Sequence, residues 1–282
     1  MITRRNFLKT TTLATASALI LPDILKAAPV HKDAGLQLYT LRDLIAGDLR
    51  GTLKKVAAIG YTWIEAAGYA DGKFYGLSPS VFRKMVEDCG LKAISSHAGI
   101  NSENRHMAID AHAELGVPFL VLPWISMPEK PIRDDYSQVA LMLNDLGDAC
   151  RQAGMKFAYH NHNFEFVRID DTTGYDILLN ETDPNNVCFE SDIFWMVYAG
   201  ADPFAYFAKY PGRFALWHVK DMDNTSDKGF APVGTGVIDY SPVFAEKVKA
   251  GMSYFFVEQD TCKDDPLKSV KTSYNNLVKI VY

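Results

Sequence analysis

The sequence contains no run of basic residues, no CxxC pair and no glycine-rich phosphate loop after its first expected strand. Its formal net charge is −5. For residues 29–282 alone the charge is −8, because the first 28 residues carry four basic side chains and one acidic one. This acidic balance is a poor match for nucleic-acid phosphates, which bind clustered lysine and arginine. The composition therefore argues against a nucleic-acid partner.

The first 28 residues are typical of an export signal rather than of a folded segment. Residues 3–9, TRRNFLK, contain paired arginines, and a threonine- and alanine-rich apolar stretch follows them. This segment resembles a twin-arginine signal. The apolar stretch is interrupted by Pro22 and Asp23, and it is shorter than the roughly 20 apolar residues of a membrane-spanning helix. We therefore predict export to the periplasm, cleavage near Ala28 and no stable membrane anchor.

The sequence contains four cysteines, Cys89, Cys150, Cys188 and Cys262. An even number of cysteines in an exported protein permits disulfides. However, Cys89 and Cys150 fall late in expected helices, and Cys188 opens an expected strand. These positions favour buried free thiols.

Residues 29–282 repeat one pattern, in which short β-branched or aromatic runs alternate with helix-period segments. The expected strands are residues 35–40, 61–66, 91–97, 118–123, 156–161, 187–191, 214–220 and 254–259. Five expected helices end in a glycine directly before a strand, at Gly60, Gly90, Gly116, Gly154 and Gly251. Strand–helix alternation predicts parallel strands with the helices outside.

Eight such units predict a single (β/α)8 TIM barrel over residues 29–282. The alternative is an open doubly wound sheet, which usually carries a glycine-rich phosphate loop after its first strand. The segment LQLYTLRD contains no such loop. The longest irregular stretch after residue 28, residues 221–236, is a candidate lid.

Ligand-type side chains are concentrated at the carboxyl ends of the expected strands, where the active sites of TIM barrels lie. They are Glu65, His97, His160, His162, Asp192, His218, Lys220, Asp221 and Glu258. The first and fourth strand ends carry Tyr39, Arg42 and Trp124 instead. In the fifth strand, alternation places Ala158, His160 and His162 on one face, which should be the crowded barrel interior.

Imidazole and carboxylate together are the ligands of Zn²⁺, Mn²⁺, Co²⁺ or Fe²⁺. His160, Asp192, His218 and Glu258 come from four consecutive expected strands, so their side chains can converge on one ion. Each alone would have a structural role, such as a helix cap or a hydrogen bond in the core. Burying all of them without a partner would cost several kcal/mol for each group. We therefore expect one bound divalent metal ion.

Seven segments resemble the xylose isomerase-like TIM-barrel superfamily, whose members are often labelled sugar phosphate isomerase/epimerase. They are GLQLYTLRD, GYTWIEAAGY, YHNHNFEF, ESDIFWM, WHVKDMD, GTGVIDY and FVEQD. In the epimerases of that family, Glu, Asp, His and Glu from the last four strands hold one ion, commonly Mn²⁺. The resemblance implies Asp192, His218 and Glu258 as three of these ligands. His160 stands where the family has its first glutamate, and Trp195 stands where many members have a second histidine.

The resemblance implies removal of a proton α to a carbonyl of a keto-sugar, through an enediolate stabilised by the metal. His162 or Glu258 would be the base, and Lys220 would stabilise negative charge or donate a proton. With His160 in place, the chain lacks the two opposed glutamates of those epimerases. Reprotonation would make the protein an isomerase or epimerase. Elimination from a 3-keto-glycoside would make it a lyase or hydratase, and both outcomes stay open.

An unphosphorylated carbohydrate is the expected partner, because the sequence has no phosphate loop and export disfavours phosphorylated intermediates. Glu65, His97, Asn163, Glu165 and Trp195 are the expected substrate-binding residues. A non-catalytic sugar-binding barrel is one alternative. A three-zinc abasic-site endonuclease is another, but it would need more histidines than the 7 present. Barrels of this kind often dimerise, so a homodimer is an open alternative.

Overall fold

Eight parallel strands close into one barrel in the order β1-β14-β11-β10-β7-β6-β5-β2. The computed structural model describes residues 33–282, so the predicted export signal lies outside the described residues. The strands are β1 (Gly35–Gln37), β2 (Trp63–Ala66), β5 (Lys92–His97), β6 (Phe119–Leu122), β7 (Lys156–His160), β10 (Val187–Asp192), β11 (Leu216–Val219) and β14 (Tyr254–Val257). The predicted TIM barrel is confirmed, and each predicted strand corresponds to one barrel strand.

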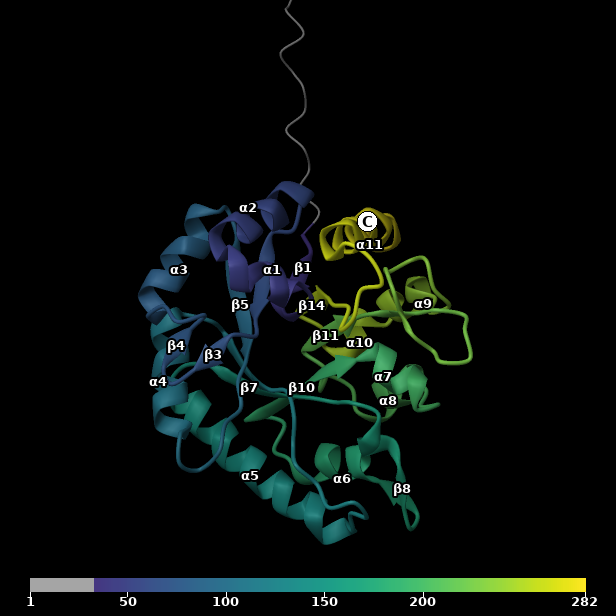
Figure 1. Cartoon of the computed structure of the whole chain (residues 1–282). Helices are drawn as coiled ribbons and strands as arrows, with labels where there is room; N and C mark the ends of the chain where they lie inside the picture. The colour runs from purple at the N-terminus through teal and green to yellow at the C-terminus, as the bar shows by residue number, and fades with distance from the viewer. Residues whose placement is uncertain (1–32) are drawn as a thin grey trace, which may run out of the picture. The chain divides into compact units, whose positions relative to one another are not determined.

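Helices surround the strands (Figure 1). They are α1 (Arg42–Gly47), α2 (Leu49–Ile59), α3 (Pro79–Asp88), α4 (Arg105–Leu115), α5 (Arg133–Gln152), α6 (Gly174–Glu181), α7 (Ile193–Tyr198), α8 (Pro203–Lys209), α9 (Tyr240–Ala245), α10 (Lys247–Ala250) and α11 (Pro266–Val281). Two short 3₁₀ helices, η1 (Leu38–Leu41) and η2 (Phe164–Phe166), follow β1 and β7. The last helix, α11, contacts α2 and so closes the ring.

In the described part of the chain, three two-stranded antiparallel hairpins lie outside the barrel. They pair β3 (Tyr69–Ala70) with β4 (Lys73–Phe74), β8 (Arg168–Ile169) with β9 (Thr172–Thr173), and β12 (Asp221–Met222) with β13 (Phe230–Ala231). Among residues 33–282, no helix has the length and apolar character needed to cross a membrane.

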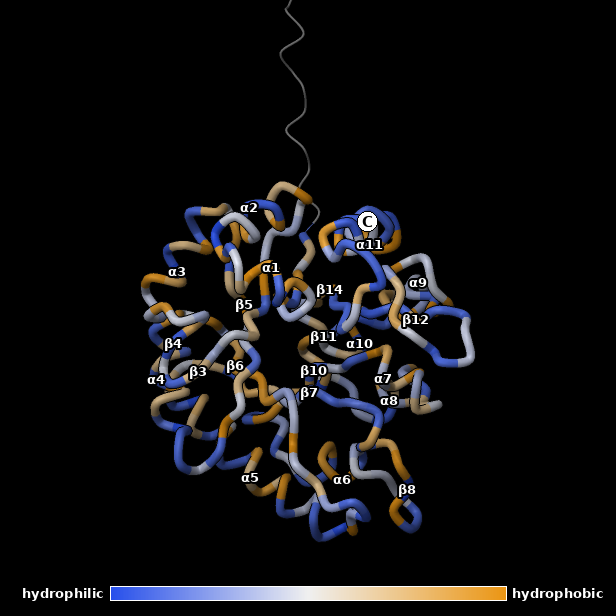
Figure 2. The backbone as a smooth tube through the Cα atoms, in the orientation of Figure 1, coloured by the Kyte–Doolittle hydropathy of each residue, from blue (hydrophilic) through white to orange (hydrophobic). Residues whose placement is uncertain are grey.

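The core has two layers, because neighbouring side chains of a strand point to opposite faces. Phe157 and Tyr159 of β7 face the helices, and Ala158 packs inside the barrel with Val121 and Leu216. This confirms the predicted orientation of β7. The outer helices are amphipathic, and hydrophobic and hydrophilic stretches alternate along α5 in Figure 2. The apolar interior fills the amino-terminal part of the barrel and leaves the other end for polar side chains.

The predicted helix ends are confirmed at all five glycines, each of which has a positive φ angle. Gly251 has a φ angle of 83°, and an added Cβ would lie 2.7 Å from the Cα of Gly212. A residue with a side chain would therefore be strained at this position both by its backbone angle and by this contact.

All four cysteines are free, as predicted. Only Cys150 is fully buried, and the other three are half-buried. Cys188 is half-buried and packs against the apolar side chains inside the barrel, near the amino-terminal end of β10.

The candidate lid is not irregular, and the prediction is corrected here. Residues 221–236 contain the β12–β13 hairpin. The buried carboxylate of Asp221 accepts hydrogen bonds from the backbone N–H groups of Gly234 and Gly236 at 2.9 Å each, of Ile238 at 3.1 Å and of Met222 at 2.8 Å. One side chain therefore holds both ends of the segment together.

We expect Asp221→Ala to lower the free energy of unfolding by about 3 to 5 kcal/mol, because four backbone N–H groups lose a charged acceptor at once and the donor in Met222 is buried. Asp221→Asn keeps one acceptor oxygen and should lose clearly less. Denaturant unfolding measures both values, and limited proteolysis should show cleavage within residues 221–238 of the alanine variant. Equal stability of the wild type and Asp221→Ala would contradict this role.

Candidate active site and metal centre

A cavity of about 530 Å³ lies at the carboxyl ends of the barrel strands. Its lining includes His97, His160, His162, Lys220, Glu258 and Asp260. Tyr39, Arg42 and Trp124, from the two strand ends without ligand-type residues, also line it. The side chains of Tyr39 and Trp124 are exposed, and the guanidinium of Arg42 lies 4.2 Å from the centre of the Tyr39 ring. The cavity thus combines a polar base with aromatic side chains at its edge.

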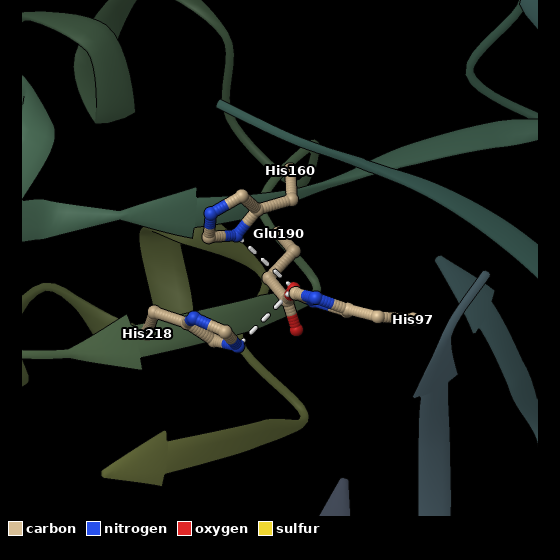
Figure 3. Close-up of side chains that lie close together, drawn as sticks. All are labelled: His97, His160, Glu190 and His218. Atoms are coloured by element: carbon tan, nitrogen blue, oxygen red, sulfur yellow. Dashed lines mark hydrogen bonds and ion pairs between the residues drawn. The ribbon is translucent and has the colours of Figure 1, made fainter. Parts of the chain in front are cut away.

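Two carboxylates and three imidazoles form one buried cluster beside this cavity. We call it the inner group, and its members are Glu65, His97, His160, Glu190 and His218. The imidazoles point toward the Glu190 carboxylate (Figure 3). Glu190 Oε2 lies 2.7 Å from His97 Nε2, 3.2 Å from His160 Nδ1 and 3.2 Å from His218 Nε2.

Glu65 joins the inner group from β2. Its Oε2 lies 2.5 Å from Nε2 of His218 and 3.3 Å from Nε2 of His97. The same oxygen accepts a hydrogen bond of 2.7 Å from the side-chain amide of Gln37. Glu65, Glu190 and His218 are completely buried. The two glutamates therefore share the same pair of imidazoles inside the barrel.

A second cluster surrounds the ammonium group of Lys220. We call it the outer group, and it consists of Asp192, Lys220, Glu258 and Asp260. The Nζ atom lies 2.6 Å from Glu258 Oε2, 2.7 Å from Asp260 Oδ1 and 2.9 Å from Asp192 Oδ2. His218 connects the two groups, because its Nδ1 lies 2.8 Å from Glu258 Oε2 while its Nε2 faces Glu65 and Glu190.

Strand alternation explains why there are two groups. Glu190 and Asp192 are two residues apart in β10, so both point into the barrel at successive depths. His218 at the end of β11 and Lys220 just after it follow the same rule. In the sheet, Glu190 is paired with His160, and Asp192 is paired with His218. In β10 and β11 a step of two residues therefore moves a side chain from the inner group to the outer group, and His218, which is level with Asp192, contacts both groups.

The neighbouring carboxylates control the protonation of His218 in the inner group and of Lys220 in the outer group. Burial alone would lower the pKa of His218, but Glu190 and Glu258 outweigh it and hold this pKa well above its ordinary value. Burial would also lower the pKa of Lys220, but Asp192 and Glu258 raise it well above the ordinary value. Lys220 is therefore an ammonium ion at neutral pH.

Other histidines and carboxyl groups of the site are controlled by burial. Burial lowers the pKa of His160 well below its ordinary value, and burial together with Lys220 lowers the pKa of His162 to about 3. Burial raises the pKa of Asp192 to about 6 against the attraction of Lys220. The imidazoles of His160 and His162 are therefore neutral at neutral pH.

The structure brings three of the four expected metal ligands together: Asp192, His218 and Glu258 offer donor atoms within 4.8 Å of one another. His160 instead belongs to the inner group, and its Nε2 lies 3.7 Å from Asp192 Oδ2. The expected catalytic residues His162, Lys220 and Glu258 all line the cavity.

The expected substrate-binding residues are spread more widely. His97 lines the cavity, whereas Glu65 is buried in the inner group. Glu165 is also buried, and it accepts hydrogen bonds from the Tyr159 hydroxyl and the backbone N–H of His162. Burial raises its pKa to about 7. Its contacts position the loop after β7.

Asn163 and Trp195 are half-buried, and neither belongs to the cavity lining. The Trp195 ring centre lies 5.8 Å from that of His162. Trp195 thus packs near His162 outside the cavity lining, and its role in substrate binding stays a prediction.

Sequence reasoning missed Glu190, Asp260 and Gln37. A signal was available for the first two, since Glu190 precedes Asp192 by two residues and Asp260 follows Glu258 by two residues. The same alternation that selected His160 and His162 thus applies to β10 and β14. No comparable signal marks Gln37, which becomes part of the site only through its hydrogen bond to Glu65.

The fit of a divalent ion differs between the two groups. In the inner group, Oε1 of Glu65 and Oε1 of Glu190 are buried and have no hydrogen-bond partner among the described residues. Histidine nitrogens and a carboxylate are suitable donors for a first-row divalent ion. In the outer group, Lys220 already contacts both carboxylates that would bind an ion. The donor chemistry thus fits a divalent metal ion.

The chain matches the family model of the xylose isomerase-like TIM barrel over residues 53–274, and it belongs to this family. The inosose dehydratase of Lacticaseibacillus casei is 29% identical over 154 residues, which cover 48% of this chain and 51% of the relative. That of Clostridium tetani is 31% identical over 161 residues, with 50% and 53% covered. The chain thus matches about half the length of these curated relatives.

Solved structures with a similar fold support this family assignment. A sugar phosphate isomerase/epimerase from Parabacteroides distasonis ATCC 8503 superposes with a TM-score of 0.79 and 30% identity, covering 91% of this chain and 97% of the other. The IOLI protein with a bound zinc atom has a TM-score of 0.69 and 16% identity, with 88% and 97% covered. At that identity the likeness shows the fold alone.

We expect Lys220→Met to lower the free energy of unfolding of the metal-free protein by about 3 to 5 kcal/mol, because it leaves buried carboxylates without their counter-ion. Lys263→Met is the matched control. The Lys263 ammonium lies 2.9 Å from Asp223, but its side chain is 73% exposed, so its loss should leave the stability nearly unchanged. Urea unfolding measures both. An equal effect of the two substitutions would show that the outer group does not depend on Lys220.

Proposed function

We propose that the protein is a carbohydrate lyase that removes a proton next to the ketone of an unphosphorylated keto-sugar and then expels a β-leaving group. The observation that carries the proposal is the composition of the cavity, in which the neutral imidazole of His162 and the ammonium of Lys220 line the same space. A base and an acid in one cavity suit an elimination, which needs one proton removed and one proton delivered.

His162 or Glu258 takes the proton from the carbon next to the ketone, and the electrons of that C–H bond form the enediolate. These electrons then form a carbon–carbon double bond as the bond from the β-carbon to oxygen breaks. Lys220 supplies the proton that lets the oxygen leave as water or as an alcohol. Asp192 and Glu258 keep Lys220 protonated until that point.

A divalent ion held by donors of the site would act as a Lewis acid at the ketone and a neighbouring hydroxyl. The chain's own residues define the rest of the site. Trp124 and Tyr39 are exposed aromatic side chains at the cavity, where they can pack against the apolar face of a sugar ring. His97 and Asp260 offer polar atoms for hydroxyl groups.

An isomerase or epimerase is the second candidate, because solved relatives carry that name. Epimerisation by two opposed glutamates requires a carboxylate on each side of the substrate. In this chain the end of β7 contributes His160 and His162 to the cavity, whose lining also includes Glu258, directly after the last strand. This composition favours elimination. The partial matches to inosose dehydratases support the same choice.

The location of the enzyme is part of the proposal. We infer export to the periplasm from the paired arginines of residues 3–9. An unphosphorylated sugar or glycoside is the form of carbohydrate available outside the cytoplasm. Fusing residues 1–32 to a reporter that is active only after twin-arginine export would test this part by itself.

The reaction can be tested with an inosose and a panel of 3-keto-glycosides, incubated with the metal-supplemented protein in D₂O. We expect a product lighter than the substrate by one water or one alcohol, detected by mass spectrometry and by the ultraviolet absorbance of the new conjugated ketone. A deuterated epimer or isomer without elimination would instead support the second candidate. Neither elimination nor deuterium uptake across the panel would overturn both.

Glu258→Gln separates an enzyme from a sugar-binding barrel. The variant cannot accept a proton and weakens the position of Lys220, so we expect turnover to fall by about 100-fold or more. Sugar affinity, measured by calorimetry, should stay within a few-fold of the wild type. Glu87→Gln, on the exposed face of α3, is the control and should behave as the wild type. Unchanged turnover in Glu258→Gln would remove this residue from the mechanism.

A further inference from the structure

The inner group has the composition and the spacing of a metal site in its own right. His97, His160, Glu190 and His218 each offer one donor atom, and all four atoms lie within 4.8 Å of one another. Ligands about 2.0 to 2.1 Å from a tetrahedral ion lie about 3.3 Å apart. The three distances from Glu190 Oε2 to the imidazole nitrogens are 2.7 to 3.2 Å. Small side-chain shifts would therefore open the space for an ion.

The charges of the inner group also call for a cation. Glu65 and Glu190 are completely buried, and both contact the same imidazoles. No lysine or arginine of residues 33–282 forms an ion pair with either glutamate. Buried carboxylates are unfavourable unless a positive charge or a proton compensates them. A divalent ion would compensate both at once.

The outer group differs, because it already contains its cation. The Lys220 ammonium lies within 3 Å of Asp192 Oδ2 and Glu258 Oε2, the two carboxylate oxygens that an ion in the outer group would need. An ion bound there would repel this ammonium at close range in a site of low dielectric constant. The inner group contains no lysine or arginine, so an ion there would displace only protons of its imidazoles, and Lys220 forms its ion pairs with the outer carboxylates only.

We propose that the chain binds a divalent cation in the inner group, one layer deeper in the barrel than the ligand set implied by the family resemblance. The ligands are His97, His160, Glu190 and His218. Three imidazoles and one carboxylate select Zn²⁺ or Co²⁺ over Mn²⁺ and Mg²⁺, which prefer oxygen. Glu65, held by Gln37, orients His97 and His218 from behind.

An ion can reach this site from the cavity. His97 and His160 belong both to the inner group and to the cavity lining, and the His97 side chain is 12% exposed. The ion would therefore lie at the base of the cavity and below Lys220. The proposal concerns the place of binding and holds whichever sugar reaction the protein catalyses.

The test measures binding of Zn²⁺ and Co²⁺ to the metal-stripped full chain by competition with a chromophoric chelator. We expect Glu190→Gln to weaken binding by at least 100-fold, and Asp192→Asn, its neighbour in the outer group, to change it by less than about threefold. The Co²⁺ complex of the wild type should show the strong visible bands of four-coordinate cobalt. Asp192→Asn should keep these bands, and Glu190→Gln should lose them. Anomalous diffraction at the zinc edge locates the ion directly.

His97→Asn is a second inner-group variant in case Glu190→Gln does not fold, because His97 is the least buried of the four ligands. Circular dichroism establishes that each variant is folded. The proposal is overturned if Asp192→Asn loses the ion while Glu190→Gln and His97→Asn keep it. It is equally overturned if the wild type binds neither cation, since the inner group would then be a hydrogen-bonded network alone. Neither result depends on finding the substrate.

Discussion

The compensation of carboxylates buried inside the barrel is the constraint on which the rest of the site depends. Five acidic side chains, Glu65, Glu190, Asp192, Glu258 and Asp260, converge at the carboxyl ends of the strands. Histidines and one lysine face them. His218 is central, because one of its nitrogens contacts Glu258 and the other contacts Glu65 and Glu190. Its imidazole thereby couples the two layers of charge, which also approach each other where His160 Nε2 lies 3.7 Å from Asp192 Oδ2. A change in the protonation or ligation of His218 therefore alters the charge next to the carboxylates of both layers. For this reason the depth of a bound ion matters for the chemistry at the cavity.

The barrel supports this concentration of charge because its interior is divided along its axis. At the amino-terminal end, Val121, Ala158 and Leu216 pack as an apolar plug. The polar layers begin directly above the plug, where the side chains of the same strands change from apolar to ionisable. Phe157 and Tyr159 on the outer face of β7 tie that strand to the helices, so the position of His160 is set by packing on both sides. Strands therefore carry Glu65, His97, His160, Glu190, Asp192 and His218. His162, Lys220, Glu258 and Asp260 come directly after strand ends.

Much of this architecture could be predicted from the sequence, since the period of the strands and the glycines at helix ends are local signals. The inward face of β7 and the strand ends that carry ligand-type residues followed from the same signals. The depth of each inward-facing side chain along the barrel axis could not be predicted. Glu190 and Asp192 are both inward-facing residues of β10, and sequence alone does not tell which of them shares a layer with His160. That depends on the register between strands, which pairs Glu190 with His160. The role of Asp221 could not be predicted either, because the backbone N–H groups that it binds lie up to 17 residues away in the sequence.

Lys220 shows how this difference in depth bears on reactivity. It lies two residues beyond His218 on the same face, so it belongs to the layer above, where Asp192, Glu258 and Asp260 hold its ammonium. The outer layer thus contains a lysine ammonium, whereas the inner layer combines imidazoles and carboxylates and has no lysine or arginine in its ion pairs. The proton on Lys220 and the positive charge of an ion beneath it would then act on the substrate from different depths of the cavity. An elimination needs such a separation, because the carbonyl oxygen and the leaving group are on different carbon atoms and must be polarised at the same time.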